Sequence, residues 1–155
     1  MKKVLSLLWM MTILTFAFTS CGDDDNEPKI DNLEKGIHKI AVEISGDTDA
    51  YSIICTFGGT TLSGPAKLYD ENNDYQGNSY TLTNPSKYTF SCQTSENATF
   101  LTSAFTISTT EKGKKLTLKL VAYIDDKKAD ELTKTVDSGD KEVTVETVSF
   151  STKTL

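Results

Sequence analysis

Apolar residues alternate with polar ones along much of the chain, and the most regular example lies at residues 115–124. There Leu116, Leu118, Leu120, Ala122 and Ile124 occupy every second position. Successive side chains of a β-strand point to opposite sides, so a period of two places all five on one face. The pattern predicts a central strand with one face in the hydrophobic core.

Weaker alternation predicts further strands on both sides of this segment. They are expected at residues 37–45, 51–57, 66–70, 75–82, 88–92, 99–108, 127–136 and 143–150. Residues 127–136 are polar and charged, which is typical of an edge strand that avoids pairing with foreign chains. In the last strand the apolar positions skip from Val145 to Val148, which predicts a β-bulge.

Turn-forming residues separate the predicted strands. Asp125 and Asp126 predict a two-residue hairpin turn, and Gly113 supplies a residue suited to positive φ before the central strand. The glycines and the proline of residues 58–65 predict a flexible connection at which the chain crosses from one sheet to another. A polar turn at residues 71–74 is expected to join two short strands.

The number and spacing of the strands predict the fold class. About eight or nine short strands, separated by turns every eight to twelve residues or so and without a helix-period segment, indicate an all-β chain. We expect a single antiparallel β-sandwich, immunoglobulin-like in general architecture. A small closed β-barrel is the alternative.

The first 27 residues have a different pattern. Lys2 and Lys3 precede an apolar run at residues 4–18, and two small residues then precede Cys21. This is the layout of a cleavable export signal with a cysteine at the cleavage point, where a thiol can carry a lipid. The stretch resembles the signal peptide and lipobox of a bacterial lipoprotein, although Phe18 stands where leucine is most often found.

The resemblance implies a location. An acidic patch directly behind Cys21, at residues 23–25, is similar to the surface-export signal of lipoproteins from Bacteroidetes-type bacteria. We therefore expect Cys21 to carry diacylglycerol and palmitate and to anchor the chain in the outer membrane, at the cell surface. An uncleaved transmembrane anchor, display on the periplasmic face and a plain acidic spacer are the alternatives. The anchor would need about 18 to 20 apolar residues, and this run has about fifteen.

Three segments follow from these patterns. Residues 1–20 form the predicted signal peptide, residues 21–35 an acidic tether, and residues 36–155 the β-sandwich domain. Loss of the signal would leave 135 of the 155 residues and change the net charge from −6 to −8. Every basic residue is lysine, and an acidic chain without arginine is not expected to bind nucleic acid.

Few residues suggest catalysis. His38 is the only histidine, and no Gly-x-Ser-x-Gly motif occurs, so we expect no enzyme and no cofactor. Cys55 and Cys92 both fall on the apolar faces of predicted strands. In an exported protein they are candidates for a disulfide between the two sheets, and two unpaired buried thiols are the equal alternative.

The polar turn and its flanking strands carry the candidate ligand-binding residues, namely Tyr69, Asp70, Asn72, Asp74, Tyr75 and Tyr80. The spacing of Asp70, Asn72 and Asp74 matches the opening of a calcium loop, but Tyr75 stands where the loop needs glycine and Thr81 where it needs glutamate. We therefore predict no regular metal site. Exposed tyrosines beside amides and carboxylates suit sugar or protein recognition, and closure of one end of the sandwich is the alternative role.

These observations favour a non-catalytic binding or accessory module of the cell envelope, with a glycan or another envelope protein as the ligand. A structural or adhesive surface component that assembles through an edge strand is the alternative. No motif identifies the ligand.

Overall fold

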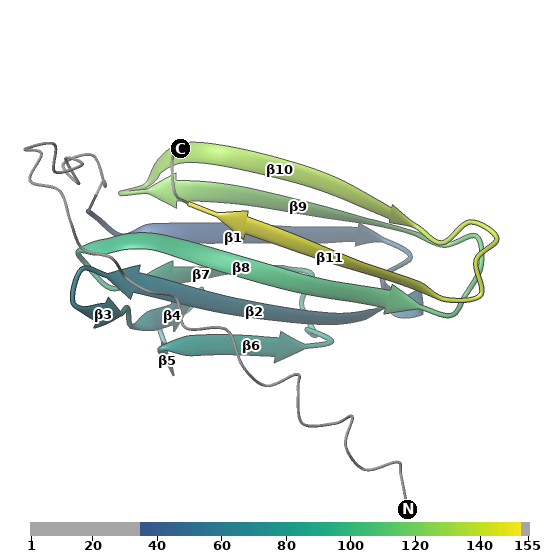
Figure 1. Ribbon diagram of the computed structural model, residues 1–155, viewed down its shortest axis with the longest axis horizontal. Helices are drawn as coiled ribbons and strands as arrows, with labels where there is room; N and C mark the ends of the chain where they lie inside the picture. The colour runs from purple at the N-terminus through teal and green to yellow at the C-terminus, as the bar shows by residue number, and fades with distance from the viewer. Residues whose placement is uncertain (1–34, 153–155) are drawn as a thin grey trace, which may run out of the picture. The chain divides into compact units, whose positions relative to one another are not determined.

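The computed structural model describes residues 35–152. The predicted signal peptide, Cys21 and all but the last residue of the predicted tether lie outside the described residues. Two antiparallel sheets lie face to face and form a β-sandwich, not a closed barrel (Figure 1). Within residues 35–152, no helix has the length and apolar character to cross a membrane.

The six-stranded sheet contains the predicted central strand. Its strands, in spatial order, are β10 (Lys127–Asp137), β9 (Lys115–Ile124), β1 (His38–Gly46), β7 (Thr89–Thr94), β4 (Leu68–Asp70) and β5 (Tyr75–Gly77). The five-stranded sheet contains β11 (Thr144–Ser151), β8 (Ala98–Thr109), β2 (Ser52–Thr61) and β3 (Gly64–Pro65), and β6 (Ser79–Thr83) also pairs with β2. A short 3₁₀ helix, η1 (Thr48–Ala50), joins β1 to β2.

The core lies between the sheets, and aromatic rings form its centre. Phe57 of β2 is completely buried and meets Phe105 of β8 and Phe90 of β7 in edge-to-face contacts, with 6.4 Å between ring centroids in both pairs. Phe90 belongs to the other sheet, so these contacts join the two layers. Leu116, Leu118 and the other alternating residues of β9 are buried beside them, as predicted.

The predicted hairpin turn and the predicted edge strand are confirmed. Asp125 and Asp126 have φ angles of 47° and 61°, the positive values that a tight two-residue turn between right-twisted strands requires. β10 lies at the edge of the six-stranded sheet and pairs only with β9 there. Its register with β9 shifts between Lys128 and Asp130, as at a β-bulge.

The bulge predicted in the last strand is wrong. β11 pairs with β8 without a register shift, from Thr144 opposite Thr109 to Ser151 opposite Thr102. Thr144 and Val148 point into the core, whereas Val145 points outward and is 60% exposed. The threonine fills an inward position that the apolar pattern had assigned to a valine.

The prediction of one continuous strand at residues 75–82 is also wrong. It is divided at Asn78 into β5, which pairs with β4 in the six-stranded sheet, and β6, which pairs with β2 in the five-stranded sheet. The predicted crossing near residues 58–65 does occur, but between β3 and β4 and after a tight hairpin. β2 extends through both glycines, Gly58 and Gly59, instead of ending before them.

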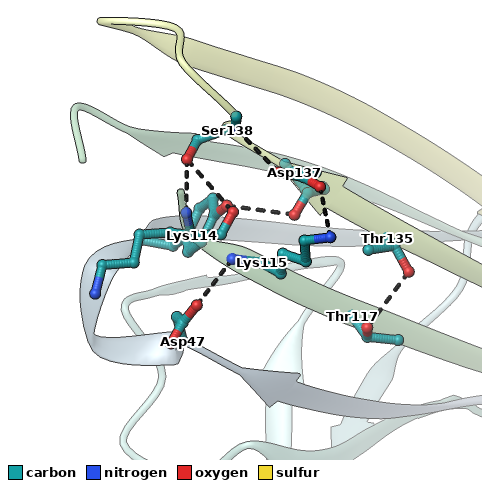
Figure 2. Close-up of polar contacts among 10 residues, drawn as sticks. Asp47, Lys114, Lys115, Thr117, Thr135, Asp137 and Ser138 are labelled. Carbon is teal, nitrogen blue, oxygen red and sulfur yellow. Dashed lines mark hydrogen bonds and ion pairs between the residues drawn. The ribbon is translucent and has the colours of Figure 1, made fainter. Parts of the chain in front are cut away.

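Backbone and side-chain hydrogen bonds join the turns at one end of the sandwich (Figure 2). The Asp47 N–H donates to the Lys115 carbonyl at 2.8 Å, and the Lys115 N–H donates to Asp47 Oδ2 at 2.9 Å. The Lys115 ammonium also lies 2.9 Å from Asp137 Oδ2, and this hydrogen bond lowers the pKa of the Asp137 carboxyl. Gly46 has a φ of +99°, which allows the chain to turn directly beside Lys115.

Tyr51 and Ser138 complete this end of the domain. The Tyr51 hydroxyl donates to the Lys114 carbonyl at 2.7 Å, and burial raises the pKa of this phenol. The Lys114 N–H donates to Ser138 Oγ at 2.9 Å, and the Ser138 N–H donates back to the Lys114 carbonyl at 3.0 Å. The turns after β1, β8 and β10 are therefore fixed to one another.

Candidate functional site

The candidate site is the β4–β5 hairpin, and the carboxylate of Asp70 holds its loop together. Asp70 Oδ1 accepts hydrogen bonds from the backbone N–H groups of Asn72 at 2.9 Å and Asp74 at 3.0 Å. Asp70 Oδ2 accepts a third from the Gln76 side-chain amide at 2.9 Å. Asn73 adopts a φ of 65°, which asparagine tolerates better than most residues. The loop is thus shaped by its own acid before any ligand arrives.

Two tyrosines lie side by side on this hairpin. The rings of Tyr69 and Tyr75 have their centroids 5.8 Å apart at an interplanar angle of 54°. Tyr75 is 58% exposed, whereas Tyr69, its partner on the neighbouring strand, is partly buried. The two rings together form an aromatic surface on the hairpin, with Tyr75 as its exposed part.

Tyr80 does not belong to this cluster. It lies on β6 in the other sheet, and its ring stacks on Phe57 with 6.0 Å between centroids and 21° between planes. Burial is the main cause of its raised pKa, followed by the negative charges of Asp70 and Glu71. Tyr80 therefore covers the core at the edge where the hairpin lies, which is the structural role considered for these tyrosines.

Two residues outside the predicted set support the loop from β7 and the segment before it. The Gln93 side-chain amide donates to Asn73 Oδ1 at 3.1 Å, and Lys87 Nζ lies 3.4 Å from Glu71 Oε1. The Lys87 ion pair is exposed and adds little stability. Gln93 is adjacent because β4 pairs with β7, with Tyr69 opposite Gln93. Alternation within single strands does not reveal such a neighbour.

Solved structures with this arrangement of strands identify the family. A crystal structure of a DUF4425 family protein from Bacteroides ovatus is 37% identical, with a TM-score of 0.74 over 79% of this chain and 99% of that chain. The chain belongs to the DUF4425 family. A second DUF4425 crystal structure, a domain of unknown function from Bacteroides vulgatus, is 39% identical, with a TM-score of 0.73 over 78% of this chain and 98% of that one.

A more distant structure shares only the fold with this DUF4425 chain. It is the NMR structure of the calcium-bound form of a protein from Parabacteroides distasonis, 15% identical, with a TM-score of 0.58 over 83% of this chain and 99% of that chain. The search against protein-family models gave no match, and the search of curated proteins gave none either.

The two candidate disulfide cysteines of this DUF4425 chain are free thiols, and both are completely buried. Cys55 lies on β2 and Cys92 on β7, so they face the core from opposite sheets. Burial raises the pKa of the Cys92 thiol to about 12, and it also raises the pKa of the Cys55 thiol. A thiol that stays protonated is a poor nucleophile, so neither cysteine is suited to covalent chemistry.

The remaining candidate groups have structural positions. Among residues 35–152, no three His, Cys, Asp or Glu side chains come together in a way that could hold a metal ion. His38 is 1% exposed, and its Nδ1 lies 2.6 Å from the Thr152 hydroxyl, which joins the two ends of the described domain. In this position the imidazole is not accessible to a substrate in solution.

Proposed function

We propose that this DUF4425 chain is a lipid-anchored, non-catalytic binding module of the outer membrane. In this proposal its β4–β5 hairpin contacts a glycan or another envelope protein at the cell surface. The lipobox-like sequence that ends at Cys21 supports the anchor, and the acidic patch at residues 23–25 supports outward display. The relatives from Bacteroides species are consistent with this type of lipoprotein.

The exposed ring of Tyr75 is the observation that supports binding by the hairpin. It contacts the ring of Tyr69 on the neighbouring strand, and it follows a loop whose backbone is fixed by the Asp70 carboxylate. The exposed side chains of Asn72 and Asp74 add hydrogen-bonding groups beside the ring. A preorganised aromatic surface with adjacent polar groups is typical of sugar-binding and protein-binding sites.

Calcium is not part of this proposal. Both oxygens of Asp70 already accept hydrogen bonds from the loop itself, so this carboxylate acts as the organiser of the turn. The calcium in the Parabacteroides distasonis structure belongs to a chain of 15% identity and provides no ligand residues here.

Replacing Tyr75 with alanine is expected to weaken ligand binding by about tenfold or more, because removal of a central aromatic contact typically costs about 2 kcal/mol. Its melting temperature should remain within about 2 °C of the unaltered protein, because an exposed ring contributes little to stability. A glycan array and an envelope-protein pull-down would supply the ligand, and titration calorimetry would measure its affinity.

Tyr123→Ala is the matched control. Tyr123 is also a surface tyrosine, but it lies on β9 with Lys39 Nζ 5.1 Å from its ring centroid, away from the hairpin. Equal binding by all three proteins would exclude the hairpin as the site. A large fall in the melting temperature of Tyr75→Ala would instead assign the tyrosine pair a structural role.

The anchor is tested separately by Cys21→Ser. A diacylglyceryl group supplies the two acyl chains that stable membrane attachment requires, and serine cannot receive them. We expect the variant to move from the membrane fraction to the soluble fraction after a carbonate wash, whereas Ser20→Ala should remain with the membranes. Retention of Cys21→Ser would show that the apolar run at residues 4–18 itself holds the chain.

A further inference from the structure

The two outer faces of the sandwich differ in charge. The outward-facing positions of the six-stranded sheet include many charged residues, among them Lys39, Glu43, Lys115, Lys119, Lys128, Glu131 and Asp137. Several form ion pairs there, such as Lys115 with Asp137 at 2.9 Å and Lys128 with Glu131 at 3.0 Å. This face is similar to an ordinary solvated protein surface.

The outer face of the five-stranded sheet has no charged residue at the outward-facing positions of β2, β6, β8 and β11, all of which lie in the described part of the chain. Those positions are Ser52, Ile54, Thr56, Gly58, Thr60, Ser79, Thr81, Thr83, Phe100, Thr102, Ala104, Thr106, Ser108, Val145, Thr147, Ser149 and Ser151. We call this surface the neutral face. In a chain with 25% charged residues, its hydroxyl-rich composition is unusual.

The neutral face has both a depression and a projecting side chain. Gly58 lacks a side chain, and a Cβ there would meet only the Thr102 hydroxyl oxygen, at 3.8 Å. Together with the small residues Ala104 and Ser149 it forms a shallow depression of about 520 Å³. Four residues before Gly58 on the same strand, Ile54 projects outward and is 42% exposed.

We propose that the neutral face binds the neutral face of a second copy of the chain, in a dimer with two-fold symmetry. The axis lies in the interface and follows the row that contains Ala104 and Thr56, which are opposite each other in β8 and β2. Rotation about this axis reverses the strand direction. It therefore places Ile54 of each copy over the Gly58 depression of the other.

Charge restricts where a second copy can bind. The chain has a net charge of −6, so two copies repel each other over most of their surfaces. The neutral face carries no like charges to oppose contact, and its hydroxyl groups can donate and accept hydrogen bonds with equal facility. A surface that pairs with itself must contain both the projection and its receptor, and here Ile54 and Gly58 provide them.

The size of the neutral face is sufficient for a weak dimer. Strand geometry gives a length of about 27 Å from Ser52 to Thr60 and a width of about 19 Å across the four strands. The corresponding area is about 500 Å² per copy, or about 1,000 Å² in total, near the lower limit for a specific interface. We therefore expect reversible association and not an obligate dimer.

Cysteine cross-linking tests the position of the axis. Ala104→Cys places a thiol on the axis, facing its own copy across about 10 Å, the separation of two packed sheets. A short bismaleimide applied to cells producing the full chain should convert most of this variant to a species of doubled mass. Ala41→Cys is the matched control, because Ala41 lies in the middle of β1 on the charged outer face.

The unaltered chain measures any background reaction of Cys21. Equal cross-linking of Ala104→Cys and Ala41→Cys, or no doubled mass from either, would overturn the proposal. Cross-linking of Ala104→Cys mainly to other envelope proteins would also overturn it, because a different partner would then cover the neutral face.

Sedimentation equilibrium of the full chain in detergent provides the second measurement. Thr106→Lys places a charge within the proposed interface and should raise the dissociation constant of the dimer by about tenfold or more, because a charge enclosed without a partner opposes association. Thr133→Lys introduces the same charge on the outer face of β10 and should leave the constant unchanged. If the chain stayed monomeric at all concentrations up to about 100 μM, any dissociation constant would be higher than that of typical reversible dimers, and the proposal would be refuted.

Discussion

Replacing Phe57 with alanine is expected to lower the free energy of unfolding by about 3 to 5 kcal/mol, the usual cost of removing a buried aromatic ring. Phe57 has no exposed surface, and its ring contacts Tyr80, Phe90 and Phe105. These neighbours come from both sheets, so the cavity would lie where the layers meet and could not close by movement of one strand. Urea unfolding monitored by circular dichroism would measure the change, and the melting temperature should fall by about 10 °C or more.

Phe100→Ala is the matched control for this prediction. Phe100 points outward from β8 and is only partly buried, so its removal should cost about 1 kcal/mol or less. If the two alanine variants were equally stable, the aromatic cluster around Phe57 would not be the centre of the core.

Replacing Gly46 with alanine is expected to destabilise the domain by about 3 kcal/mol or more. A Cβ at this position would collide with the Lys115 carbonyl oxygen, and the φ of +99° is strained for any residue with a side chain. Backbone strain of this kind costs about 1 to 3 kcal/mol, and displacement of Lys115 would break the hydrogen bond from the Asp47 N–H, worth about 1 kcal/mol more. The midpoint of urea unfolding should fall while its slope remains constant.

Gly113→Ala is the control that separates the cost of backbone strain from the cost of a steric clash. Gly113 also has a positive φ, +69°, but a Cβ there would meet nothing within 4 Å. We expect it to cost only about 1 to 2 kcal/mol, the price of the left-handed conformation alone. A Gly46→Ala variant no less stable than Gly113→Ala would show that the approach of β1 to Lys115 does not constrain the turn.

The alternation of apolar and polar residues is sufficient to predict a strand whose one face lies against the same core along its whole length. β9 is an example, because Leu116 to Ile124 face a single core from end to end and the strand occupies the predicted residues. The tight turn at Asp125 and Asp126 was also predictable, since two short polar residues tolerate the positive φ that the hairpin needs. In both cases the physical cause lies within a few residues of the feature.

Prediction failed where the environment changes along a strand or where polarity is ambiguous. Residues 75–82 alternate throughout, yet the chain leaves one sheet at Asn78 and joins the other, and alternation does not report which sheet a strand joins. Threonine is as acceptable inside as outside, so Thr144 could take an inward position while Val145 was left exposed. The apolar skip in β11 was therefore read as a bulge.

The candidate hairpin was located by composition, but its chemistry was not. The spacing of Asp70, Asn72 and Asp74 matches the opening of a calcium loop, and the sequence indicates all three as candidate ligand-binding residues. In the structure Asp70 points back into the loop and accepts hydrogen bonds from the other two backbones. The direction of a short polar side chain depends on loop geometry, which no periodic pattern encodes.

The position of the β4–β5 hairpin at one lateral edge of the sandwich has a consequence for avidity. β5 and β6 lie along that edge, and β10 and β11 lie along the opposite one (Figure 1). In the proposed dimer the two-fold axis runs from one edge to the other, so both hairpins lie along the same edge of the dimer, with their tyrosine pairs on its two opposite outer faces. Such a pair would be bivalent. A ligand with repeated epitopes, such as a long polysaccharide, would bind the dimer about 10² to 10⁴ times more tightly than one copy, which is the usual gain in affinity from linked sites.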